Sequence, residues 1–221
     1  MLRPLESIRK KGYQHLKIAT VAFETFVNNL KSFKSNMSIG ESEEYHKTHL
    51  MDFFKNTYFS PNYLVAQKGD IDFVIHSSAD SQSAAVVLFE VKSTTNKSEM
   101  ITTENLNKKA MQEILLYYLR ERVGGNNLEL KYLAVTNTEE FFIFDAHEFE
   151  RLFYNNTKLR RDFNEFAEGQ KSGKNTDFFY QNIAKTYIEE VKESIEYVHF
   201  NIKDYTKLLD KDDDKSRRKL S

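Results

Sequence analysis

Apolar residues recur at helical spacing along the first sixty residues of the chain. The first set comprises Leu16, Ala19, Phe23, Phe26 and Leu30. This spacing predicts an amphipathic helix over residues 13–31. A second apolar set comprises Leu50, Phe53, Phe54 and Tyr58. It predicts another helix, which begins near Ser42 and ends before Pro61 because serine caps helix starts and proline cannot continue a helix.

The apolar period changes to two in the middle of the chain, where Ile71, Phe73 and Ile75 alternate with other residues. Residues 84–92 follow as a run rich in valine and aromatic side chains, so two neighbouring strands are predicted. Helical spacing returns from residue 103 to the glycine pair at 124–125, and short strands are predicted at residues 130–135 and 141–144. The order helix, strand, strand, helix, strand, strand predicts an α/β fold with a mixed sheet.

The remainder of the chain is predicted to be helical, through residues 147–153 and again through residues 178–195. A polar linker at residues 168–176 separates the two stretches. Residues 210–221 contain Leu220 as their only apolar residue, which predicts a disordered tail or a truncated linker.

The composition narrows the possible functions. The chain has 221 residues, with 32 Lys or Arg, 33 Asp or Glu and no Cys, so its net charge is −1. The absence of cysteine excludes disulfides, a thiol nucleophile and zinc sites with sulfur ligands. Near-neutral charge argues against nucleic-acid binding by bulk charge alone. No apolar run approaches the length of a membrane-spanning helix, so we expect no membrane partner.

Asp72, Glu90 and Lys92 form the informative group of charged residues. Glu90 and Lys92 lie two apart at the end of an apolar strand, so they face the same side of the sheet, and Asp72 lies on the adjacent predicted strand. Buried charges need partners, and two close carboxylates repel each other unless a cation lies between them. Oxygen ligands of this kind suit Mg²⁺, and the lysine could hold or deprotonate a water beside the metal.

The three residues alone are equally consistent with a structural ion pair at the edge of a sheet. The preceding residues 84–89 are all apolar, which places the charges at a buried strand end rather than on a solvated face. This context favours a catalytic interpretation.

With Asp72, Glu90 and Lys92 in these positions, the sequence resembles the PD-(D/E)XK nuclease superfamily. Five further segments resemble the N-terminal nuclease domain of type IIG restriction enzymes, in which endonuclease, methyltransferase and target recognition share one polypeptide. They are SEEYHK at 42–47, NKKAMQE at 107–113, YYLRER at 117–122, AVTN at 134–137 and FIFDA at 142–146. The resemblance covers roughly residues 40–205.

The resemblance implies a restriction-endonuclease-like mixed sheet flanked by helices, with extra helices at both ends. Residues 1–38 would be a helical extension, 39–155 the nuclease core, 156–209 a C-terminal helical segment and 210–221 the tail. It implies that Asp72 and Glu90 bind Mg²⁺, for which Mn²⁺ could substitute, and that Lys92 is catalytic. The substrate would be double-stranded DNA, cut in a prokaryotic cytoplasm, with a possible transient dimer for double-strand cleavage. Methyltransferase and target-recognition domains would lie outside this chain.

Two further site residues follow from the resemblance. Many such nucleases carry a glutamate on the first core helix, and Glu43 shares the apolar face with Leu50 whereas Glu44 is rotated away. Related nucleases also place a glutamine and a tyrosine four residues apart after the lysine strand. Here Glu113 precedes Tyr117 by four, so either Glu113 replaces the amide or Gln112 turns inward.

Three functions therefore compete at this point. The first is an Mg²⁺-dependent endonuclease domain of a restriction-modification system. The second is a nuclease-like fold kept as an inactive binding or assembly module, and the third is a free-standing repair or phage nuclease. Lys108, Lys109, Arg120 and Arg122 give the third predicted helix a basic side, which suits either DNA phosphates or solvent.

Overall fold

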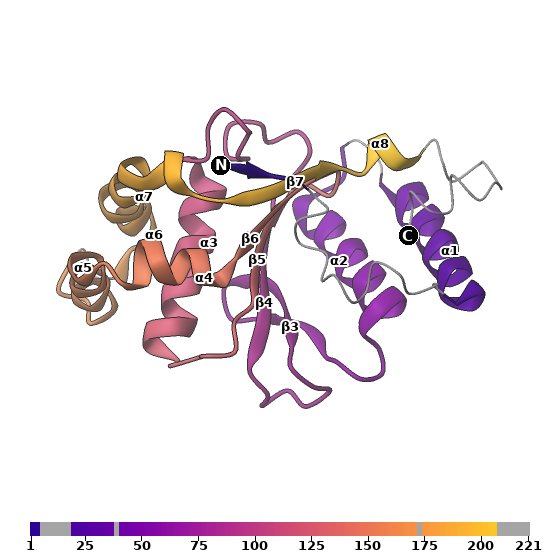
Figure 1. Ribbon diagram of the computed structural model, residues 1–221, viewed down its shortest axis with the longest axis horizontal. Coiled ribbons are helices and arrows are strands. Elements are labelled where there is room, and N and C mark those ends of the chain that lie inside the picture. Colours follow the sequence, from indigo (N-terminus) through magenta and orange to yellow (C-terminus); the bar gives the residue numbers. More distant parts are fainter. Residues whose placement is uncertain (5–18, 38–39, 172–173, 207–221) are drawn as a thin grey trace.

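A mixed sheet forms the centre of the molecule, with helices on both of its faces (Figure 1). The computed structural model describes residues 1–4, 19–37, 40–171 and 174–206. Within these residues the sheet has seven strands, β1 (Leu2–Arg3), β2 (Val65–Lys68), β3 (Ile71–His76), β4 (Ala85–Val91), β5 (Tyr132–Thr136), β6 (Glu140–Asp145) and β7 (Tyr197–Asn201). This confirms the predicted α/β class and is compatible with a restriction-endonuclease-like fold.

The spatial order of the strands is β1-β7-β6-β5-β4-β3-β2. The pairs β4–β5 and β1–β7 are parallel, and the other neighbours are antiparallel. Parallel neighbours need a long crossover connection, which a helix supplies between β4 and β5. The C-terminal end of β4 therefore lies where the chain leaves the sheet toward that helix.

The described α-helices are α1 (Thr20–Asn36), α2 (Glu43–Phe54), α3 (Lys109–Leu119), α4 (Ala146–Phe149), α5 (Thr157–Ala167), α6 (Thr176–Phe178), α7 (Lys185–Val191) and α8 (Lys203–Thr206). Four of them continue in π-helical turns, η3 (Lys55–Phe59), η4 (Arg120–Gly124), η5 (Glu150–Tyr154) and η7 (Phe179–Ala184). A short 3₁₀ turn, η8 (Lys192–Ser194), follows α7. The crossover helix between β4 and β5 is α3.

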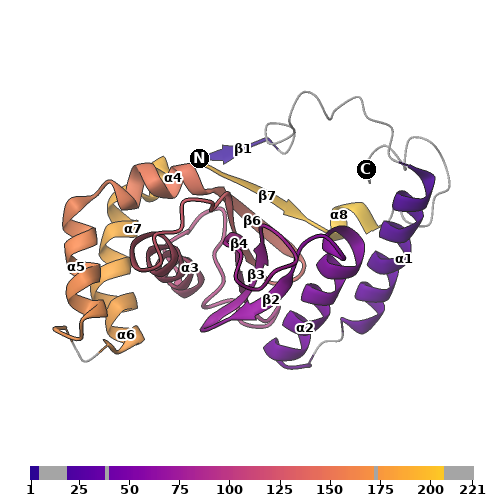
Figure 2. The ribbon, with the colours of Figure 1, turned by 90° about the horizontal axis from the view of Figure 1, so that it is seen from below.

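The two faces of the sheet carry separate apolar cores (Figures 1 and 2). Helices α1 and α2 cover one face, where Leu30, Phe33 and Leu50 pack against Phe73 and Phe89 of the sheet. The rings of Phe73 and Phe89 stack with centroids 4.2 Å apart. This aromatic layer fixes α2 beside the ends of β3 and β4.

On the other face, α3 lies between the sheet and the helical layer formed by α5, η7 and α7 (Figure 2). Residues 110–119 of α3 are all buried as a result. A helix enclosed on all sides is expected to be apolar throughout. Gln112 and Glu113 depart from that rule and need polar partners.

Several element boundaries differ from those predicted. The third helix begins at Lys109 and not at residue 103. The Asn105 side chain accepts a hydrogen bond from the Asn107 N–H, and Thr102 and Asn105 bond each other's backbone. Such local bonds compete with helix formation. The first helix spans Thr20–Asn36, and its predicted residues 13–18 lie outside the described residues, as does the predicted tail at 210–221.

The sequence prediction also missed three strands. β7 lies inside the segment 156–209 that was expected to be helical, and β1 lies inside the expected helical extension 1–38. β7 pairs with β6, and β1 extends the sheet beyond β7. β2 pairs with β3 at the opposite edge. Short strands like these depend on a partner strand distant in sequence, which a local pattern does not reveal.

Candidate functional site

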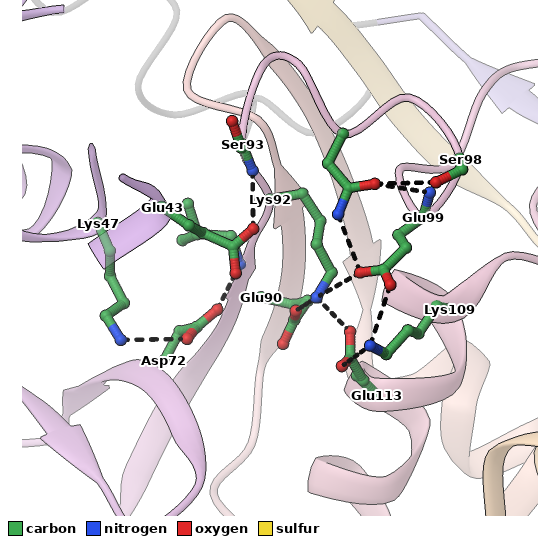
Figure 3. A network of polar contacts seen from close by, with 12 residues as sticks. Glu43, Lys47, Asp72, Glu90, Lys92, Ser93, Ser98, Glu99, Lys109 and Glu113 are labelled. Carbon is green, nitrogen blue, oxygen red and sulfur yellow. Dashed lines mark hydrogen bonds and ion pairs between the residues drawn. The ribbon is translucent and has the colours of Figure 1, made fainter. Parts of the chain in front are cut away.

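Charged side chains meet at the end of β4, between α2 and α3 (Figure 3). In the antiparallel register of β3 and β4, Phe73 pairs with Phe89, which places Asp72 opposite Glu90. Val74 and Leu88 belong to the core on the α3 face, so Asp72 and Glu90 share that face. Lys92 follows directly, and its N–H donates to the Thr136 carbonyl at 2.8 Å. The sheet thus brings together the predicted residues Asp72, Glu90 and Lys92.

Lys92 is surrounded by carboxylates. Its Nζ lies 2.7 Å from Glu90 Oε1, 2.5 Å from Glu113 Oε2 and 3.7 Å from Glu99 Oε2. The side chain is only 5% exposed. Burial alone would lower the pKa of Lys92, but the charges of Glu90 and Glu113 and the bonds with them raise it above its usual value. The ammonium is therefore held in its charged form.

Glu90 is the most deeply buried of the acidic groups. The residue is 2% exposed, and no hydrogen-bond donor of the described chain reaches its Oε2. Burial, followed by the charges of Asp72 and Glu113, raises the pKa of the Glu90 carboxyl well above its usual range. A carboxylate in this position needs either a proton or a second cation nearby.

Asp72 has both oxygens engaged. Its Oδ2 accepts the Val91 N–H at 2.7 Å, and its Oδ1 lies 3.4 Å from Nζ of Lys47 on α2. Burial raises the pKa of Asp72, and the Val91 bond and the charges of Lys47 and Lys92 only partly oppose that shift. Asp72 is thus oriented by β4 on one side and by α2 on the other.

The structure distinguishes between the two candidate glutamates at the start of α2. Glu43 Oε2 accepts the Ser93 N–H at 2.9 Å, so Glu43 reaches the end of the lysine strand (Figure 3). The Glu44 side chain is 68% exposed and pairs with Lys47 on the same helix. Ser42 caps α2 by accepting the Tyr45 N–H, which sets the helix start that places Glu43.

Glu113, and not Gln112, contacts the lysine on the α3 side. Glu113 bonds Lys92 and lies 3.9 Å from Lys109 Nζ. Gln112 is also buried, but it turns away and donates to Asn107 at 3.2 Å. Burial, and then the charges of Glu90 and Asp72, raise the pKa of Tyr117, so its hydroxyl stays protonated beside the carboxylates.

Three residues at the site, Lys47, Glu99 and Tyr180, were not predicted from the sequence, and Lys109 was expected only on the basic side of the third helix. Lys47 contacts Asp72, Glu99 approaches Lys92, and Lys109 Nζ bonds Glu99 at 3.0 Å. Tyr180 of η7 is buried, and after burial the charges of Glu113 and Glu90 contribute most to the rise in its pKa. The Glu-x-x-Lys pattern of α2 indicates a helical ion pair between Glu44 and Lys47 but not the contact with Asp72, and Glu99 and Tyr180 carry no local signal.

The basic side expected on the third helix is largely paired within the protein. Arg122 binds both oxygens of Glu150, at 2.8 and 2.9 Å, and Arg120 bonds Asp70 at 2.9 Å. Lys109 is engaged by Glu99. Three of the four basic side chains, those of Lys109, Arg120 and Arg122, are therefore engaged by carboxylates of the chain itself.

Two carboxylates of the site, those of Asp72 and Glu90, are of the type that binds a hard divalent cation. In the described ranges no group of three or more His, Cys, Asp and Glu side chains could hold a metal ion. Mg²⁺ commonly uses only one or two protein carboxylates and completes its shell with water and substrate phosphate. Asp72 and Glu90 offer two carboxylates from adjacent strand ends, and Glu90 Oε2 is a buried oxygen that accepts no hydrogen bond from the described residues.

Comparisons with known proteins give one match. A family model described as "Domain of unknown function (DUF7149)" matches residues 3–221. No curated protein and no solved structure matches the chain. None of the described helices has both the length and the apolar character to cross a membrane.

Proposed function

Because the chain belongs to the DUF7149 family, whose description gives no function, we propose from the site itself that it is a metal-dependent endonuclease domain acting on double-stranded DNA. The cation would be Mg²⁺, with Mn²⁺ as a substitute. One observation carries this proposal. Asp72, Glu90 and Lys92 converge at a strand end where negative charge exceeds positive charge and where one oxygen of Glu90 has no donor in the described chain.

Each residue has a role that its contacts allow. Asp72 and Glu90 would hold the cation, which supplies Lewis-acid stabilisation of a phosphate and of an attacking water. Lys92 keeps its proton because of its carboxylate partners, so it would offset the charge that develops on the phosphate. Glu113 fixes the direction of the Lys92 ammonium. Glu43 holds the backbone at Ser93, directly after the lysine.

The hydrolysis itself is an in-line displacement. The water oxygen forms a new bond to phosphorus and gives up a proton to solvent. The bond from phosphorus to the leaving sugar oxygen breaks, and that oxygen takes up a proton from solvent. Positioning and charge stabilisation provide most of the catalysis in phosphoryl transfer. The rigid strand ends of β3 and β4 are well suited to such positioning.

The resemblance to type IIG restriction enzymes extends the proposal to a biological role. The chain would be the cleavage module of a restriction-modification system, acting with methyltransferase and target-recognition domains outside this sequence. Its net charge of −1 suits a module whose grip on DNA is provided mainly by such partners. Transient pairing of two modules would allow both strands to be cut.

An inactive binding or assembly module is the alternative. The observation that favours it is the pairing of Lys92 with Glu90 and Glu113, which resembles a structural ion-pair cluster. The carboxylates of Asp72, Glu90, Glu99 and Glu113 outnumber the lysines that contact them, which are Lys47, Lys92 and Lys109. This excess of negative charge argues against that alternative, because a structural cluster is expected to be balanced.

A plasmid cleavage assay tests the proposal. Supercoiled plasmid is incubated with the chain and Mg²⁺, and nicked and linear products are followed on a gel. We expect cleavage by the wild type and by Lys158→Ala, whose side chain is exposed on α5, but not by Lys92→Ala. Cleavage by the chain alone at moderate salt would point to a free-standing nuclease, and weak or sequence-blind cutting to a restriction module. Equal activity of wild type and Lys92→Ala would refute the assignment.

A further inference from the structure

Lys47 is a second buried lysine at the site. It approaches Asp72 from the α2 side, whereas Lys92 lies on the other side of Asp72 (Figure 3). Lys47 lies in the second turn of α2, and its side chain is 11% exposed. Its Nζ lies 3.4 Å from Asp72 Oδ1 and also pairs with Glu44. Lysine is rarely buried to this extent unless its ammonium has a defined partner.

The two contacts of Asp72 differ in how readily they can change. The Val91 N–H that bonds Oδ2 belongs to β4 and is fixed by the sheet. The ammonium near Oδ1 is at the end of a flexible side chain. A divalent cation that binds Asp72 would therefore displace the ammonium and not the backbone N–H.

Glu44 could keep the displaced ammonium of Lys47 close to the site. It lies one turn before Lys47 on the same helix and already contacts Nζ, while its carboxylate is mostly exposed. After displacement, Lys47 would stay at the mouth of the site, close to the cation but held by Glu44. A phosphate bound to that cation would then lie within reach of a positive charge on the α2 side.

We propose that Lys47 is a tethered cation that occupies the metal-binding side of Asp72 until a divalent cation enters, and then contacts the phosphate of the DNA substrate. The proposal rests on the proposed function and adds a phosphate-binding residue to it. Lys47 and Lys92 would flank the phosphate from α2 and from β4. Lys47 thereby couples cation binding to DNA binding.

Metal titration tests the first half of the proposal. Mn²⁺ is titrated into wild type, Lys47→Met and Lys55→Met by calorimetry without DNA. Lys55 is exposed in the turn that follows α2, so its variant has the same net charge but leaves Asp72 untouched. We expect Lys47→Met to bind Mn²⁺ about tenfold more tightly, since a competing cation is removed. Lys55→Met should match the wild type.

DNA binding tests the second half. Affinity for a duplex is measured by fluorescence anisotropy with Ca²⁺, chosen as a divalent cation that does not support cleavage, and again with EDTA. We expect Lys47→Met to lose about fivefold or more in affinity with Ca²⁺ and nothing with EDTA, because the ammonium is then held by Asp72. Replacing a residue that only maintains the fold would change the DNA affinity equally with Ca²⁺ and with EDTA.

The outcomes separate this proposal from the proposed function. If the wild type binds Mn²⁺ and Lys47→Met binds it no more tightly, the role of Lys47 is refuted while the nuclease proposal stands. An equal loss of DNA affinity in both conditions also refutes it. Absence of Mn²⁺ binding by the wild type overturns both. Thermal melting checks folding, and Lys47→Gln replaces Lys47→Met if that variant does not fold.

Discussion

The two ends of α3 carry polar clusters of opposite character. At its C-terminal end, in η4, Arg122 binds Glu150 through two bonds, and Tyr118 also donates to Glu150. The bond from Arg122 lowers the pKa of Glu150 and outweighs its partial burial. This cluster is balanced in charge, partly exposed and fully paired, as expected of a group that stabilises the fold.

At the N-terminal end of α3, the cluster is unbalanced. Glu90, Glu113 and Asp72 gather near Lys92, and the pKa values of Glu90 and Asp72 are raised. Desolvating this excess of carboxylates costs more free energy than the contacts with Lys47, Lys92 and Lys109 return, as the direction of the two pKa shifts indicates. Groups kept in such a state are characteristic of functional sites. The difference between the two ends is the reason why we propose a chemical role for one and a stabilising role for the other.

The largest effect is expected for Lys92→Ala. Its removal leaves Glu90 and Glu113 buried without their cation, so unfolding free energy at pH 7 should fall by about 3–5 kcal/mol. The variant should also lose cleavage by about a hundredfold or more. Urea unfolding and the plasmid assay measure the two quantities, and stability should recover partly at lower pH, where the carboxyls take up protons. A stable variant would mean that the cluster is not buried as described.

Glu90→Gln is expected to separate stability from function. It removes one buried negative charge but keeps the shape, so without metal at pH 7 it should stabilise the fold by about 1–2 kcal/mol. Because the pKa of Glu90 is raised in the folded state, the wild type binds more protons folded than unfolded. Wild-type stability should therefore fall as pH rises through that pKa, and the fall should be smaller in Glu90→Gln. Urea unfolding across the pH range measures this, and a destabilised variant would contradict it.

Glu150→Gln probes the balanced cluster and should cost about 1 kcal/mol, with no change in plasmid cleavage. The pKa of Glu150 is lowered in the folded state, so its contribution is present above its unfolded pKa and is lost as pH falls through the folded value. Urea unfolding at pH 7 and at acid pH measures this dependence. If the contributions of Glu90 and Glu150 to the unfolding free energy changed with pH in the same direction, the distinction between the two ends of α3 would be lost.

The smallest effects are expected at the start of α2. Glu43→Gln weakens a charge-assisted bond to the Ser93 N–H and should reduce cleavage severalfold with little change in stability. Glu44→Gln alters an exposed carboxylate and should change unfolding free energy by less than about 0.5 kcal/mol. Paired cleavage rates measure the contrast. A larger activity loss in Glu44→Gln than in Glu43→Gln would reverse the assignment of the inward-facing residue.

The parts of the site that could be predicted from the sequence are those that follow from strand periodicity. A period of two and a run of apolar residues were enough to place Glu90 and Lys92 on one face, with Asp72 beside them. The choice of Glu43 over Glu44 followed from helix geometry and agrees with its contact to Ser93. Their catalytic and metal-binding roles stay predictions.

Other features depended on contacts that no local pattern encodes. Glu99 lies in the loop after β4, and its approach to Lys92 is determined by how that loop folds over α3. Lys47 forms an ordinary helical pair with Glu44 in the sequence, and only the packing of α2 beside β3 shows that it reaches Asp72. β7 was missed because its stability comes from pairing with β6.

Calorimetric titration of Mn²⁺ into the wild type and Glu90→Gln tests most directly whether the unbalanced cluster is a cation site. The wild type and Glu90→Gln should both be folded under the same conditions. Any difference in Mn²⁺ affinity between them then reports on the replaced carboxylate oxygen of Glu90. We expect saturable binding by the wild type and at least about a tenfold weaker affinity in Glu90→Gln. Equal affinity in the two proteins, or no binding by the wild type, would contradict the account.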